Sequence, residues 1–153
     1  APNSANRFGP WIATTSTRRT LTGLTRDATY RVQLVTVTDA PWWSAPATFS
    51  FRQATVPSQV LAPKVAAWPG PRQATITWSA PSSNGRSPVT GYRLRVSKPN
   101  STTQFGAWLS QPASAPTTRL TGLVKGANYR VQIVAVNSQG GANPATATFR
   151  QSR

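Results

Sequence analysis

Apolar and polar residues alternate with a period of two along several short stretches of the chain. Residues 129–136 read YRVQIVAV, in which one alternate set is apolar throughout and the other begins with arginine and glutamine. This alternation is typical of a strand with one face on a core and the other toward water. Residues 74–78 and 92–96 alternate in the same way, and no stretch has the 3.6-residue apolar stripe of an amphipathic helix. The pattern predicts an all-β protein.

Turn-forming sequences rich in proline, glycine, asparagine and serine separate these runs, as in PGP at 69–71 and PSSNG at 81–85. Seven short strands fit between residues 62 and 151, and we denote them A, B, C, C′, E, F and G in chain order. Their predicted ranges are 63–68, 73–79, 90–97, 104–109, 117–121, 127–137 and 144–150.

The chain contains an internal repeat. Residues 21–35 recur at 120–134 with five substitutions, and residues 2–4, 8–11 and 51–53 match 99–101, 105–108 and 149–151. The first copy therefore begins after strand C and contains counterparts of C′, E, F and G alone. This predicts a partial domain over 1–55, a short proline-containing linker over 56–61 and a complete domain over 62–153.

The second copy resembles a fibronectin type III domain of the bacterial extracellular type. The motifs that carry the resemblance are Ala62-Pro63, ITWSAP at 76–81, GYRLRV at 91–96, LTGL at 120–123 followed by Tyr129, and AVN at 135–137 before Gly140-Gly141. The resemblance implies an immunoglobulin-like β-sandwich with Trp78 between the sheets. It also implies a tyrosine corner, in which the Tyr129 hydroxyl bonds back to the preceding turn.

The shortened first copy raises a physical problem. About 55 residues of half a sandwich have little surface to bury, and an unpaired strand edge invites other chains. We therefore expect either further residues before Ala1, which we favour, or strands added by another molecule.

The composition narrows the classes of function. Seventeen Lys and Arg oppose two Asp, with no Glu, His or Cys, giving a net charge of +15. Paired carboxylates, thiol nucleophiles and soft-metal ligands are thus missing, and we expect neither catalysis nor a metal or cofactor. The charge favours a polyanionic partner, such as an anionic polysaccharide or cell-wall polymer. Nucleic acid is disfavoured because the basic residues are scattered rather than clustered in runs, and no apolar run reaches the roughly 18 residues of a membrane span.

Two surfaces are candidate binding sites. Trp42 and Trp43 lie in the first copy's F–G loop, where exposed aromatic rings could stack on sugars or anchor an interface. The alternative is that one or both rings pack over the end of the domain. A basic face, whose alternative is an ordinary solvated sheet face, is formed by outward residues of strands C, F and G: Arg31, Arg52, Arg93, Arg95, Arg130 and Arg150.

The sequence thus favours non-catalytic tandem fibronectin type III modules of a larger secreted or cell-surface protein. They would act as a spacer and as an adhesive or polymer-binding surface, next to other domains of the same parent protein. The alternative is a structural subunit of a virion or extracellular filament, in which a neighbouring copy completes the first domain.

Overall fold

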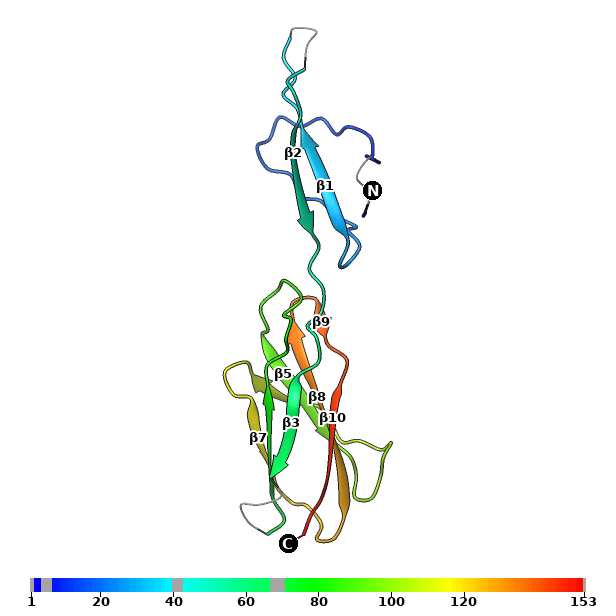
Figure 1. Ribbon diagram of the computed structural model, residues 1–153, viewed down its shortest axis with the longest axis vertical. Coiled ribbons are helices and arrows are strands. Elements are labelled where there is room, and N and C mark those ends of the chain that lie inside the picture. Colours follow the sequence, from blue (N-terminus) through cyan, green and yellow to red (C-terminus); the bar gives the residue numbers. More distant parts are fainter. Residues whose placement is uncertain (1, 4–6, 40–42, 67–70, 153) are drawn as a thin grey trace. The chain divides into compact units, whose positions relative to one another are not determined.

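The computed structural model describes residues 2–3, 7–39, 43–66 and 71–152, and the chain divides into two compact units, Ala1–Ala54 and Thr55–Arg153. Antiparallel strands form the regular structure of each unit (Figure 1). Among the described residues, no helix has the length and apolar character required to cross a membrane. The all-β prediction is confirmed.

Two sheets form the second unit. The smaller has the order β3-β4-β7, with bounds Leu61–Ala66, Ala74–Ser79 and Thr117–Leu120. The larger has the order β10-β8-β5-β6, with bounds Ala145–Arg150, Asn128–Asn137, Gly91–Val96 and Leu109–Pro112. The short strand β9, Gly140–Gly141, also pairs with β8. Strands A, B, C, E, F and G are therefore found close to their predicted positions.

The core of the second unit lies between these sheets. Trp78 is 5% exposed and its ring meets that of Tyr92 edge-on, with 5.3 Å between centroids. Around it the apolar positions of the alternating runs are buried: Leu94, Leu120, Leu123, Val131 and Ile133. Period-two patterning thus places one face of each central strand in the core, as the sequence predicts.

Strand C′ is displaced from its predicted range of 104–109, and this part of the prediction is wrong. Regular pairing with β5 begins at Leu109, opposite Leu94, whereas Phe105 forms an isolated bridge to Ser97. Between these two pairs, β5 advances by three residues, from 94 to 97, whereas the opposite segment advances by four, from 105 to 109. The extra residue defines a β-bulge. The bulge interrupts the ladder, so that the regular strand β6 starts later than the alternation suggests.

The predicted tyrosine corner is present. Tyr129 is buried, and its hydroxyl oxygen accepts a hydrogen bond of 2.8 Å from the backbone N–H of Val124. The first unit repeats this contact between Tyr30 and the N–H of Thr25 at 2.7 Å. Each tyrosine thereby fixes the turn that precedes its strand.

We expect Tyr129→Phe to lower the free energy of unfolding of the second unit by about 1–2 kcal/mol, because the N–H of Val124 loses its acceptor while the ring remains. Slower or unchanged hydrogen exchange at Val124 would contradict this role. Tyr30→Phe is the matched control, and the first unit should tolerate it better, since its hydrogen bond is more exposed and water can replace the hydroxyl there.

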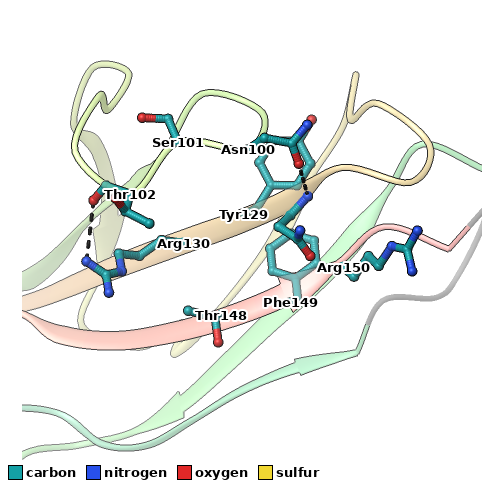
Figure 2. A pocket seen from close by; sticks show the side chains of 9 residues that line it. Asn100, Ser101, Thr102, Tyr129, Arg130, Thr148, Phe149 and Arg150 are labelled. Carbon is teal, nitrogen blue, oxygen red and sulfur yellow. Dashed lines mark hydrogen bonds between the residues drawn. The ribbon is translucent and has the colours of Figure 1, made fainter.

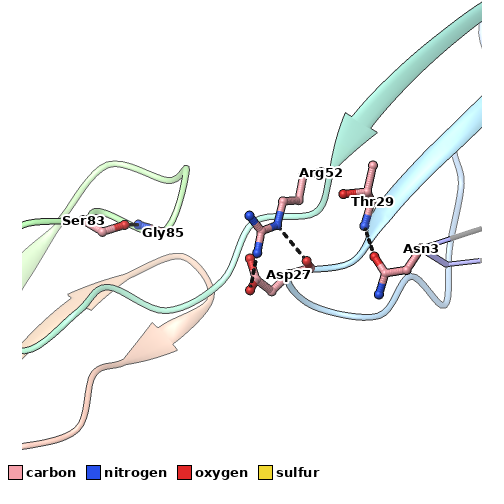
Figure 3. Close-up of polar contacts among 6 residues, drawn as sticks. All are labelled: Asn3, Asp27, Thr29, Arg52, Ser83 and Gly85. Atoms are coloured by element: carbon pink, nitrogen blue, oxygen red, sulfur yellow. Dashed lines mark hydrogen bonds and ion pairs between the residues drawn. The ribbon is translucent and has the colours of Figure 1, made fainter.

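Residues 55–60 run along the second unit. The N–H of Thr55 donates to the carbonyl of Gly85 at 2.8 Å, and Val60 belongs to the core. Asn137 is 4% exposed, and its side-chain Nδ2 donates to the carbonyls of Thr55 and Asn84, both at 2.8 Å. Gly85 is held in the same turn, where its N–H donates to the hydroxyl of Ser83 (Figure 3).

The first unit contains strands β1, Thr29–Leu34, and β2, Ala47–Arg52, which pair antiparallel. They are the counterparts of F and G. Described residues 7–28, where the counterparts of C′ and E are predicted, form no strand. In the second unit these strands pair with C and B, and a strand without a partner has no ladder to stabilise it.

Candidate functional site

Four of the six arginines predicted for a basic face belong to the larger sheet of the second unit. Arg93 and Arg95 lie on β5 between the buried residues Tyr92 and Leu94 and the partly buried Val96. Arg130 lies on β8 and Arg150 on β10, both at positions that alternate with inward-facing residues. All four therefore project from the face of the sheet that is turned away from the core.

Arg95 is held in a stacked arrangement that the sequence pattern did not predict. Its guanidinium carbon lies 4.6 Å from the centroid of the Phe105 ring and 4.5 Å from that of Trp108. Its Nε donates a 2.8 Å hydrogen bond to the side-chain oxygen of Gln132 on β8. We call Phe105, Trp108 and Gln132 the Arg95 clamp.

The bulge before β6 explains how the clamp forms. Residues three apart in a regular strand point to opposite faces, but the extra residue between Phe105 and Leu109 turns Phe105 and Trp108 toward the same guanidinium. Cation–π contacts with two rings fix the position of the charge. In the sequence, Phe105 and Trp108 are three residues apart, a spacing that predicts opposite faces of a strand. Only the pairing register with β5 shows that both rings contact Arg95.

Arg130 and Arg150 line a groove of about 430 Å³ (Figure 2). One wall is the loop after β5, where the carbonyl of Thr102 accepts a 3.3 Å hydrogen bond from Nη1 of Arg130. The Nε of Arg130 is buried and has no hydrogen-bond partner within the described part of the chain. The hydroxyl-bearing residues Ser101 and Thr148 also line the groove. The arrangement offers charge and hydrogen-bond donors to an anion.

Arg52 and Arg150 occupy equivalent positions in the two copies but differ in their surroundings. Each donates from Nε to the carbonyl of the preceding turn: Arg52 to Asp27 at 2.8 Å and Arg150 to Gly126 at 3.1 Å. In the first unit, Nη2 of Arg52 also pairs with the Asp27 carboxylate at 2.7 Å (Figure 3). The second unit has Gly126 at the position of Asp27. The positive charge of Arg150 therefore lacks the carboxylate that neutralises the charge of Arg52.

The remaining candidates do not join this groove. Arg31 lies on β1 of the first unit, opposite Ser50. Trp42 lies outside the described residues. Trp43 is 56% exposed and packs edge-on against Trp11, with 5.8 Å between ring centroids. Trp43 is thus partly engaged within its own unit and keeps an exposed surface.

The titratable chemistry near this face is limited. Within the described ranges there is no group of three or more His, Cys, Asp or Glu side chains able to hold a metal ion. Burial raises the pKa of the Tyr92 hydroxyl above its ordinary value, so this residue stays neutral beneath the sheet. The face therefore acts through permanent positive charge and hydrogen-bond donation.

The fold of the second unit is that of an immunoglobulin-like β-sandwich, in which a three-stranded sheet packs on a larger one. The family model of the fibronectin type III domain matches residues 63–151, and the chain belongs to this family.

Solved structures share the same fold. The extracellular region of rat CD45, domains d3-d4, is 17% identical with a TM-score of 0.57, over 95% of this chain and 76% of that one. The twitchin kinase region from C. elegans is 22% identical with a TM-score of 0.52, over 63% of this chain and 17% of that one. The solution structure of a human fibronectin type III domain, the fourth such domain of its protein, is 16% identical with a TM-score of 0.57, over 65% of this chain and 82% of that one. Domains of this family are generally non-catalytic binding or spacer modules and typically occur in extracellular proteins.

Proposed function

We propose that the chain is a tandem of non-catalytic fibronectin type III modules from a larger secreted or cell-surface protein. The modules act as a spacer, and the second binds an anionic polysaccharide or cell-wall polymer through the face that carries Arg93, Arg95, Arg130 and Arg150. The observation that supports this best is the groove that Arg130 and Arg150 both line, where Arg150 lacks the carboxylate that pairs with Arg52 in the first copy.

The composition agrees with this proposal. A net charge of +15 attracts polyanions over long distances. The groove supplies hydrogen-bond donors at fixed positions, which can bind an anionic group once the polymer is close. Carboxylate and sulfate groups on a sugar polymer accept paired guanidinium hydrogen bonds. Arg95, held by the Arg95 clamp, adds a third fixed charge to the same sheet face.

The proposal predicts a salt-sensitive interaction with a heparin-type polysaccharide. We expect the affinity to fall linearly on a log–log plot against salt concentration, because counterions are released from the polymer. The double substitution Arg130→Gln and Arg150→Gln should weaken binding by about tenfold per arginine, corresponding to ~1.5 kcal/mol for each charge-assisted contact. Isothermal titration at several salt concentrations measures both effects.

Two further variants distinguish the contribution of the groove to binding from the contribution of the net charge. Arg119→Gln removes one charge from β7 in the smaller sheet and should leave the affinity nearly unchanged. Gly126→Asp introduces the carboxylate found at Asp27 and should weaken binding as much as losing Arg150. Its backbone has φ +80, and Asp27 already adopts φ +60 at the equivalent place, so the fold should accept it. Equal losses from Arg119→Gln and Arg150→Gln would refute a localised site.

A further inference from the structure

The four arginines of the larger sheet lie on one diagonal line across its outer face. In order along this line they are Arg93, Arg95, Arg130 and Arg150. Arg95 faces Gln132 on β8, and Arg130 lies two residues further in the same direction. Arg130 in turn faces Thr148 on β10, and Arg150 lies two residues further (Figure 2). Every step along the line therefore advances by two residues, and the last two steps also cross to the next strand.

The pairing register sets the length of this line. Alternate residues of one strand are about 7 Å apart, and diagonal neighbours on adjacent strands are about 7–8 Å apart. From Arg93 to Arg150 the line covers about 20 Å along the strands and about 10 Å across two strand spacings, so that its ends lie about 22 Å apart. Any three consecutive arginines span about 15 Å.

No acidic side chain interrupts the line. The four arginines are the charged residues of β5, β6, β8 and β10, and residues 55–153 contain no Asp or Glu. Neutral groups hold three of the four guanidinium groups: the Arg95 clamp holds one, and the carbonyls of Thr102 and Gly126 hold two. These contacts restrict the side chains without cancelling their charge, which reduces the entropy that binding costs.

The smaller sheet has no comparable line. Its charged residues are Lys64 on β3 and Arg119 on β7, which lie on opposite sides of β4. The side chain of Arg119 donates a hydrogen bond to Gln73. Four charges in a continuous row are therefore a property of the larger sheet, and Arg119 offers a control position on the other face.

The spacing matches an extended sugar polymer better than a small anion. A pyranose unit with its linking oxygen is roughly 5 Å long, because it is built from bonds of about 1.5 Å. Anionic groups on the first and fourth units of an extended chain are then about 15 Å apart, and those on the first and sixth about 25 Å apart. A tetrasaccharide can therefore reach three consecutive arginines, whereas a hexasaccharide can reach all four.

We propose that the four arginines form one continuous track that binds a single extended chain of an anionic polysaccharide. The shortest chain that fills this arginine track has about six sugar units. The inference rests on the proposed function and deepens it, because the groove beside Arg130 and Arg150 becomes one end of a longer site whose other end is Arg93. Each arginine contacts a different anionic group of the same chain, so that the affinity depends on chain length as well as on charge.

The test measures the affinities of a heparin-derived tetrasaccharide and hexasaccharide by isothermal titration at one salt concentration. We expect the hexasaccharide to bind at least about tenfold more tightly, because it gains a fourth charge-assisted contact. Arg93→Gln and Arg150→Gln, at the two ends of the track, should each weaken hexasaccharide binding by about tenfold. Each should weaken tetrasaccharide binding by only about twofold, because one of its two placements on three arginines remains.

A variant at the centre of the track supplies the comparison. Arg95→Gln removes a contact from both placements of the tetrasaccharide and should weaken its binding by about tenfold. Arg130→Gln should do the same, and it tests the centre if Arg95→Gln does not fold. Arg119→Gln, in the smaller sheet, should change neither affinity. Equal affinities of the two oligosaccharides, or equal tetrasaccharide losses from end and central variants, would overturn the arginine track.

Further outcomes distinguish this inference from the proposed function. If long heparin binds but the dependence on oligosaccharide length is absent, the proposed function stands and the arginine track is wrong. If neither the polymer nor the oligosaccharides bind, both are wrong. A single-stranded oligonucleotide of the same net charge that binds as tightly as the hexasaccharide would also overturn the assignment of a polysaccharide to the track.

Discussion

Replacing Ile133 by alanine is expected to lower the free energy of unfolding of the second unit by about 3–4 kcal/mol. Ile133 is fully buried on β8, between the two sheets. Removing its outer carbons loses their transfer free energy and leaves a cavity that close-packed neighbours fill only in part. Since small domains are stable by only about 5–15 kcal/mol, the loss is a large share of the total.

The repeat supplies a matched control for this experiment. Leu34→Ala changes the equivalent position on β1, where the side chain is 58% exposed, and should alter stability by less than about 0.5 kcal/mol. Native-state hydrogen exchange over Asn128–Asn137 and over Thr29–Leu34 reports each unit separately. A comparable loss from both substitutions would show that Leu34 is covered in solution, contrary to its exposure in the first unit.

Gly85→Ala is expected to destabilise the second unit by at least about 3 kcal/mol. Gly85 has φ +67, a region that costs a residue with a Cβ roughly 1–2 kcal/mol. The added Cβ would also overlap the carbonyl oxygen of Thr55 and lie 2.5 Å from that of Val56. Both are backbone atoms, so residues 55–56 must move away, and the hydrogen bond from Asn137 to Thr55 is lost with them.

Gly122→Ala distinguishes the conformational cost of a positive φ from the steric cost of the added Cβ. Gly122 has a similar φ of +73, but no atom lies within 4 Å of the Cβ position, so only the conformational cost of about 1–2 kcal/mol applies. Urea unfolding of the two variants should therefore differ by more than about 1 kcal/mol. If Gly85→Ala were no worse than Gly122→Ala, the packing of residues 55–56 against this turn would contribute nothing.

Much of the fold of the second unit could be predicted from the sequence. The alternation at 74–78, 92–96 and 129–136 has a physical cause, the burial of one face of each strand, so that strands and core could be derived together. The tyrosine corner was predictable from the resemblance. Strand C′ was misplaced because a bulge changes the register without changing composition or hydrophobicity.

Less of the candidate site could be predicted from the sequence. Alternation correctly places Arg93 and Arg95 on the outer face, but it cannot tell that Arg95 lies between two aromatic rings. The different environments of Arg52 and Arg150 depend on Asp27 and Gly126, which are 25 and 24 residues away in sequence. These contacts join the turn before β1 to the end of β2, and the turn before β8 to the end of β10. They can be identified only from the folded structure.

The positive charge of Arg95 and of the other arginines on this face does not depend on pH in the physiological range. A guanidinium group remains protonated throughout the physiological range, and the chain has no histidine, the side chain whose charge changes between pH 5 and 8. Acidification between pH 8 and 5 would therefore leave the positive charge of this face unchanged. Under the proposed function, detachment of the polymer would therefore depend on competing ions or on cleavage of the polymer itself.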